Sequence, residues 1–191
     1  MAYPVLVLIN FVIGSIPFSL LLGKVFFRID IRNFGEDRNP GPANAFKAEG
    51  LILGIPSLIL DYLKGAVPLY FFISKFSLNP FIFVILSIAP ILGHMFTPFL
   101  KFHGGKGITT TFGVWSALTL WEVPTFLGSI FLIFVILKQF FKEKISDRLI
   151  VVTASVLLVA FVFLKFRDSK LTYVSMLNSL LLIFGQYKEE F

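Results

Sequence analysis

Long apolar segments separated by short polar ones limit most strongly how this chain can fold. A transmembrane helix needs about 20 largely apolar residues, and fewer where protein covers it. Seven segments approach this length, at residues 3–23, 51–74, 79–100, 106–121, 123–141, 149–166 and 171–186. Only 15% of the residues are charged, against about 25% in soluble domains, so a soluble fold would lack its polar surface. We therefore expect an all-α integral membrane protein with seven transmembrane helices, forming one domain over residues 1–191.

The distribution of Lys and Arg between the loops predicts the orientation, because cytoplasmic loops carry the excess of positive charge. One alternating set of loops holds Lys24, Arg28, Arg32, Arg38, Lys47, Lys101, Lys106, Lys138, Lys142, Lys144, Arg148 and Lys188. The other set holds only Lys75, Lys165, Arg167 and Lys170. We therefore expect a multi-pass protein of the cytoplasmic (inner) membrane, with its N-terminus outside and its C-terminus in the cytoplasm.

Composition also excludes several classes of protein. Without cysteine, the chain can form neither disulfides nor thiolate metal sites. Its two histidines, His94 and His103, are too few for a histidine-rich metal centre, and we expect no metal and no cofactor. The net charge of +6 would suit a nucleic-acid binder, but the cations flank apolar segments. We therefore expect the lipid bilayer, and no nucleic acid, as a partner.

A glycine-rich segment before the fourth apolar span is a candidate anion site. It consists of Gly104, Gly105, Lys106 and Gly107. Glycines let backbone N–H groups approach an anion closely, and a lysine beside a helix start adds positive potential. His94 lies near the end of the preceding span, where we expect the same membrane depth. The alternatives are a flexible turn with one interfacial lysine and a packing role for the histidine.

The polar loop at residues 32–47 is a second candidate. It contains Arg38, Asn39, Asn44 and Lys47 among several glycines and prolines. The dense Asn, Gly and Pro run indicates an ordered turn rather than a flexible linker. A functional site and a solvated loop without a ligand are the two alternatives.

Several polar or helix-breaking residues lie inside apolar spans. Asp61 and Lys64 are three residues apart, so they share a helix face and can neutralise each other. This pattern fits a structural ion pair and a functional site equally well. Asn178 in the last span needs a partner, and a helix–helix hydrogen bond is the first expectation. Residues 14–17 are expected to kink the first span or to pack closely.

Taken in order, these stretches resemble the PlsY family, the bacterial membrane glycerol-3-phosphate acyltransferases that use acyl phosphate. The matching residues are Gly14, Ser15, Ile16, Pro17, Asn39, Pro40, Gly41, Asn44, Asp61, Lys64, Gly65, Gly93, His94, Phe102, Gly104, Gly105, Lys106, Gly107, Thr110, Gly113, Asn178 and Gly185. The resemblance implies transfer of a fatty acyl group from acyl phosphate to the 1-hydroxyl of sn-glycerol 3-phosphate. The products would be lysophosphatidic acid and phosphate, in phospholipid biosynthesis.

The resemblance also implies roles for residues of this chain. The implied catalytic residues are His94, Lys106 and Asn39. The implied substrate- and phosphate-binding residues are Gly104, Gly105, Gly107, Arg38, Asn44, Lys47 and Asn178. Asp61 and Lys64 would support the site from a distance. The implied enzyme is a monomer without a cofactor, and its active site faces the cytoplasm.

The polar loop departs from the family pattern. The family's Gly-Ser-Gly-Asn-Pro-Gly-Ala-Thr-Asn run is replaced by residues 35–44, where the serine is lost and Glu36 and Asp37 are present. Two carboxylates repel a phosphate unless Arg38 offsets them. A non-catalytic or altered-acceptor paralogue that binds acyl phosphate or phospholipid is therefore the alternative. A small anion transporter is disfavoured, because the polar motifs crowd one side rather than the midplane.

Overall fold

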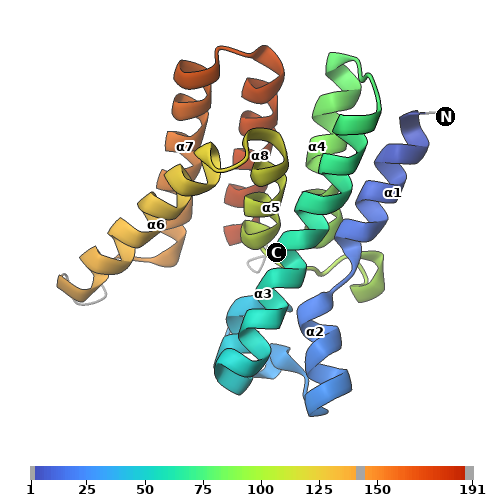
Figure 1. Ribbon diagram of the computed structural model, residues 1–191. Coiled ribbons are helices and arrows are strands. Elements are labelled where there is room, and N and C mark those ends of the chain that lie inside the picture. Colours follow the sequence, from blue (N-terminus) through green and yellow to red (C-terminus); the bar gives the residue numbers. More distant parts are fainter. Residues whose placement is uncertain (1–2, 141–144, 188–191) are drawn as a thin grey trace.

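Over residues 3–140 and 145–187, which the structure describes, the apolar segments fold into helices and no strand is present (Figure 1). In this computed structural model the helices, in chain order, are α1 Tyr3–Ser15, α2 Phe18–Leu22, η1 Gly23–Phe27, η2 Ile31–Phe34, α3 Pro42–Lys75, α4 Pro80–Met95, η3 Pro98–Leu100, α5 Ile108–Thr119, α6 Glu122–Phe140, α7 Asp147–Phe166 and α8 Ser169–Tyr187. The expected all-α architecture is confirmed.

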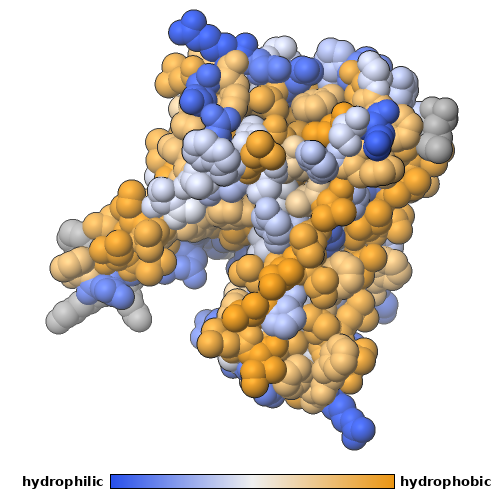
Figure 2. All heavy atoms as spheres, in the orientation of Figure 1, coloured by the Kyte–Doolittle hydropathy of each residue, from blue (hydrophilic) through white to orange (hydrophobic). Residues whose placement is uncertain are grey.

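Four helical segments in the described ranges are long and apolar enough to cross a membrane, namely α3, Pro80–Leu100, α6 and α7. A fifth arises if α1 and Phe18–Phe27 form one span, which is bent by 41°. α5 has 12 residues and packs extensively on α3. Figure 2 shows hydrophobic side chains over α6 and along the outer face of α3, the surface that a lipid bilayer would cover.

The bend in the first span follows from residues 14–17. α1 ends at Ser15 and α2 begins after Pro17, because proline has no N–H to continue the helical hydrogen bonds. A Cβ on Gly14 would overlap the backbone of Pro90. The sequence therefore yields both expected features, a kink and a close contact between α1 and α4.

α3 begins earlier than the expected second span. It starts at Pro42 rather than at residue 51, and its first part turns sharply at Glu49 and Gly50. Gly50 has a φ of +58°, a conformation that glycine adopts without steric cost. Hydropathy could not reveal this extension, because residues 42–50 are too polar to belong to an apolar span. The extension brings the end of the polar loop under the helical bundle.

A buried ion pair joins α3 to the bend of the first span. Lys64 Nζ lies 2.6 Å from Asp61 Oδ1, and both side chains are only 1% exposed. Ser19 Oγ donates to Asp61 Oδ2 over 2.9 Å, and Lys64 Nζ also donates to the carbonyl oxygen of Ile16 over 2.8 Å. Of the two interpretations of this sequence pair, the geometry fits a structural ion pair.

Asn178 links α8 to α5 in the core. Its Oδ1 accepts a hydrogen bond from Trp115 Nε1 over 2.9 Å, and its Nδ2 donates to Thr111 Oγ1 over 3.0 Å. Both Asn178 and Trp115 are fully buried. The expected helix–helix hydrogen bond is therefore present, and it fixes α8 beside α5.

Candidate active site

Three segments that are far apart in the sequence line one pocket of about 370 Å³. They are the part of the polar loop that precedes α3, the glycine-rich loop before α5, and the last turns of α8. The lining residues are Glu36, Asp37, Arg38, Asn39, Pro40, His103, Gly104, Gly105, Lys106 and Gly185. The two candidate segments predicted from the sequence thus form opposite walls of a single pocket.

The glycine-rich loop folds back onto the end of α4. The Gly104 N–H donates to the carbonyl oxygen of Met95, and the Gly105 N–H donates to that of His94, each over 3.1 Å. A Cβ on Gly104 would collide with the His94 carbonyl oxygen, and one on Gly105 would collide with the His94 ring. The loop therefore needs glycine for close packing. These two N–H groups hold the loop on α4 instead of pointing at a ligand, and the result is a fixed position for Lys106.

The two histidines occupy different places. His94 is buried, and its ring lies behind Gly105 rather than on the pocket wall. His103 lines the pocket, and its Nδ1 lies 2.7 Å from the carbonyl oxygen of Lys101. A carbonyl only accepts hydrogen bonds, so Nδ1 is the donor in this contact. His103 was not among the site residues predicted from the sequence, since no motif places it beside the polar loop, and it lines the pocket in the structure.

Asn44 organises the opposite wall. Its Nδ2 donates to Asp37 Oδ1 over 3.1 Å and to the carbonyl oxygen of Asn39 over 2.8 Å. A Cβ on Gly35 would collide with the Asn44 amide. Arg38 lies between Asp37 and Asn39 in the chain, with a φ of +45° and an exposed side chain. The segment is thus an ordered turn, as predicted, and it holds Asp37, Arg38 and Asn39 at the pocket.

An ion pair crosses the pocket from one loop to the other. Lys106 Nζ lies 2.8 Å from Asp37 Oδ2, and the two side chains are 25% and 28% exposed. Burial raises the pKa of Asp37, but hydrogen bonds from Lys106 and Asn44 outweigh it and hold the pKa below its ordinary value. Asp37 is therefore ionised at neutral pH. The sequence suggested Arg38 as the charge that offsets this carboxylate, and the structure pairs the carboxylate with Lys106.

The remaining predicted residues lie away from the pocket wall. Lys47 is exposed on the first part of α3, and Asn178 is enclosed between helices. Asp61 and Lys64 are buried at the bend of the first span. Gly107 has a φ of +83° and precedes the first residue of α5. Within the described ranges, no group of three or more His, Asp or Glu side chains is placed to hold a metal ion.

Two further residues, Thr97 and Gly185, support the pocket but were not among the site residues predicted from the sequence. Thr97 Oγ1 donates to the carbonyl oxygen of Ser15 over 2.6 Å, so it ties the segment before the glycine-rich loop to the bend of the first span. A Cβ on Gly185 would lie 3.1 Å from the carbonyl oxygen of Lys106. Glycine at this position lets α8 approach the loop. A threonine near the end of an apolar span carries no sequence signal for such a contact.

Comparison with known proteins gives consistent matches. Residues 4–191 match the family model described as glycerol-3-phosphate acyltransferase. The glycerol-3-phosphate acyltransferase of Fusobacterium nucleatum is 36% identical over 184 residues, which cover 96% of this chain and 90% of that protein. Glycerol-3-phosphate acyltransferase 1 of Thermotoga maritima is 44% identical over 124 residues, which cover 64% of this chain and 60% of that protein.

Solved structures show the same fold. Crystal structures of PlsY, an integral membrane glycerol 3-phosphate acyltransferase, superpose on the whole chain and cover 90% of theirs. The glycerol 3-phosphate form has a TM-score of 0.83 at 27% identity, and the lysophosphatidic acid form has a TM-score of 0.82 at 25% identity. The helices described above therefore have the arrangement of an integral membrane protein.

Proposed function

The chain belongs to the glycerol-3-phosphate acyltransferase family, and on this premise we propose that it transfers a fatty acyl group from acyl phosphate to the 1-hydroxyl of sn-glycerol 3-phosphate. The products are 1-acyl-glycerol 3-phosphate (lysophosphatidic acid) and inorganic phosphate, in phospholipid biosynthesis. The observation that carries this proposal is the meeting of Lys106 with Arg38 and Asn39 in one pocket. Both substrates bring a phosphate, and cationic and amide donors from two walls can bind both groups.

The pocket suits a reaction between two bound substrates. The acceptor hydroxyl oxygen forms the new ester bond to the acyl carbon, and the bond from that carbon to the phosphate oxygen breaks. Because acyl phosphate is already activated, no covalent enzyme intermediate is needed. Lys106 stabilises the negative charge that develops on the leaving phosphate. The hydroxyl proton passes to phosphate oxygen, while the two loops keep the reacting atoms close together.

Several other predicted residues position Lys106 and the polar loop. Gly104, Gly105 and Gly107 allow the turn that positions Lys106, and the buried ring of His94 supports this turn from behind. Asn44 fixes the opposite loop through its two donated hydrogen bonds.

Two predicted phosphate ligands act without lining the pocket. Lys47 adds positive potential from an exposed position on the first part of α3. Asn178 holds α8 against α5 through the hydrogen bonds to Thr111 and Trp115. In this proposal neither residue contacts the reacting atoms.

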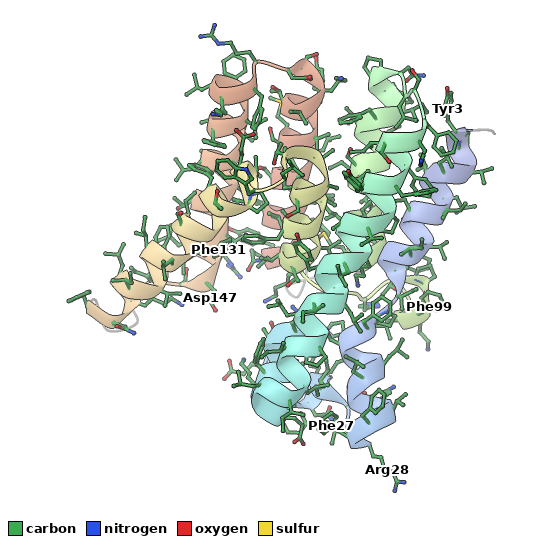
Figure 3. All side chains as sticks on the ribbon, in the orientation of Figure 1. Tyr3, Phe27, Arg28, Phe99, Phe131 and Asp147 are labelled. Atoms are coloured by element: carbon green, nitrogen blue, oxygen red, sulfur yellow. The ribbon has the colours of Figure 1, made fainter. Side chains whose placement is uncertain are left out.

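We also propose seven membrane crossings, with the N-terminus outside and the C-terminus and pocket on the cytoplasmic side of the inner membrane. In support, Figure 1 has the N-terminal end of α1, the α3–α4 connection and the α7–α8 connection at one end of the molecule. Figure 3 likewise places Tyr3 and Arg28 at opposite ends. α5 and α8 are the additional crossings, packed against neighbouring helices. Among the cations that predicted this orientation, Lys142, Lys144 and Lys188 lie outside the described residues.

The working unit is a single domain over residues 1–191, active as a monomer. The family match over residues 4–191 supports one domain. All three walls of the described pocket come from one chain, which is compatible with a monomer. A non-catalytic membrane protein that binds acyl phosphate or phospholipid is not favoured, since the matched relatives bear the name of an acyltransferase.

Release of inorganic phosphate tests the reaction. Purified protein in monoolein or detergent receives palmitoyl phosphate, with and without glycerol 3-phosphate. We expect release that depends on the acceptor and that falls about 100-fold in Lys106→Ala, because a cation that stabilises developing charge is lost. Lys75→Ala, an exposed lysine at the end of α3, is the matched control and should retain activity. Acceptor-independent release by folded protein would contradict the proposal.

A further inference from the structure

We infer that the Asp37 carboxylate is an internal anion that a substrate phosphate must displace from Lys106, so that Asp37 sets the affinity of the pocket for phosphate. The inference rests on the proposed function and refines it. It assigns an affinity-determining role to a residue of a segment in which this chain departs from the family pattern.

The contacts of Asp37 divide between its two oxygens. Oδ1 accepts from Asn44 Nδ2 over 3.1 Å and from the Asn39 N–H over 3.3 Å, so the polar loop holds the carboxylate in place. Oδ2 lies 2.8 Å from Lys106 Nζ. One oxygen is thus anchored in the loop and the other faces the cation that would bind phosphate. A phosphate dianion bound to this ammonium group would lie close to the carboxylate, whose negative charge repels it, so binding favours release of Asp37 from Lys106.

The pair can open without disruption of the core. Both side chains are about one quarter exposed and both line the pocket, and such partly exposed pairs stabilise a protein only weakly. A phosphate that carries more charge than a carboxylate can therefore replace Asp37 at a modest cost. Buried ion pairs such as Asp61 with Lys64, at 1% exposure, could not exchange in this way.

The charges around the pocket indicate why Asp37 would compete with a substrate phosphate for Lys106. Among the described lining residues, Glu36 and Asp37 lie beside Arg38 and Lys106, so two carboxylates oppose two cationic side chains. The low pKa of Asp37 also makes its carboxylate a poor acceptor for a substrate proton, which separates this role from that of a general base. Asp37 therefore weakens phosphate binding, and its removal should strengthen it.

The test substitutes Asp37→Asn, which removes the charge and keeps an oxygen that can accept from Asn39 and Asn44. The measured quantities are the KM of each phosphate substrate and the inhibition constant of inorganic phosphate. We expect the inhibition constant to fall about threefold to fivefold, the size set by a partly exposed ion pair. The KM of the substrate whose phosphate binds Lys106 should fall by a similar factor.

Glu36→Gln is the matched control. It removes one negative charge from the same pocket, and in the part of the chain that the structure describes Glu36 forms no ion pair with Lys106. We expect a change of less than about twofold, because only its field is lost. An equal change in both variants would overturn the inference, since general charge and not displacement would then explain it.

Equilibrium binding of inorganic phosphate to the detergent-solubilised protein, without turnover, separates the inference from the proposed function. Tighter binding by Asp37→Asn, at an unchanged melting temperature, supports the inference even if no variant transfers an acyl group, in which case only the proposed reaction fails. Unchanged or weaker binding would overturn the inference, because Asp37 would then serve to position Lys106. A phosphate titration of Asp37→Ala, which also loses the loop contacts, repeats the test if Asp37→Asn does not fold.

Discussion

At the scale of single residues, the pocket depends on glycines, whose lack of a Cβ allows close packing. The glycine-rich loop lies so close to α4 that a Cβ on Gly104 or Gly105 would overlap His94. The sequence predicted the importance of these glycines and the closeness of His94. It could not predict that their N–H groups bond to α4, because this depends on how the loop returns to the helix.

Gly105→Ala should reduce acyl transfer by at least about tenfold, since a shift of about 1 Å in a positioned group is costly. The methyl group would meet the His94 ring and displace Lys106. Gly128→Ala in α6 is the matched control, because a Cβ there meets nothing closer than 4.0 Å. The rate of phosphate release by each variant checks the prediction, and equal rates would contradict it.

A second residue-scale prediction concerns pH. Arg32 donates to the Asp30 carboxylate over 2.6 and 2.9 Å, and this hydrogen bonding, opposed by burial, lowers the pKa of Asp30. A carboxyl with a lowered folded pKa stabilises the protein above its unfolded pKa of about 3.9, and this contribution is lost as the pH falls through the folded value. Asp30→Asn should therefore lower the Tm at pH 6, and the difference should shrink below about pH 4. A difference that widens toward low pH would refute this sign.

At the scale of elements, apolar length predicted most helices but not their exact ends. Asn79 caps α4 by accepting from the Ile82 N–H, and α6 begins at Glu122 with Pro124 in its first turn, each within one residue of the start of its expected span. The first part of α3 was missed because it is polar and because its shape depends on the turn at Gly50. The bend after α1 was predicted, whereas its fixation by α3 requires the three-dimensional structure.

The ion pair that fixes this bend gives a prediction for stability. Lys64→Met leaves the Asp61 carboxylate buried without its cation, which costs about 3–5 kcal/mol. Asp61→Asn combined with Lys64→Met removes both charges and should restore part of this loss. Thermal unfolding of the single and double variants in detergent measures the effect. A double variant no more stable than Lys64→Met would contradict a paired role.

At the scale of the whole molecule, the charge distribution and the fold indicate a pocket toward one end of a bundle of transmembrane helices. The absence of cysteine from the chain permits a direct test of orientation by single cysteines. Ser77→Cys, in the α3–α4 connection, should react with a membrane-impermeant maleimide added outside intact cells. Asn33→Cys, exposed in the polar loop, should react only after the membrane is opened. Reaction of both from outside would contradict the proposed topology.

In the proposed mechanism, Lys106 of the glycine-rich loop binds phosphate for acyl transfer to glycerol 3-phosphate. Transfer of radiolabelled glycerol 3-phosphate into chloroform-soluble lysophosphatidic acid tests this step. The wild type should form this product only when acyl phosphate is present, and folded Lys106→Ala should form about 100-fold less. No labelled product from the folded wild type, or an undiminished rate from Lys106→Ala, would contradict the account.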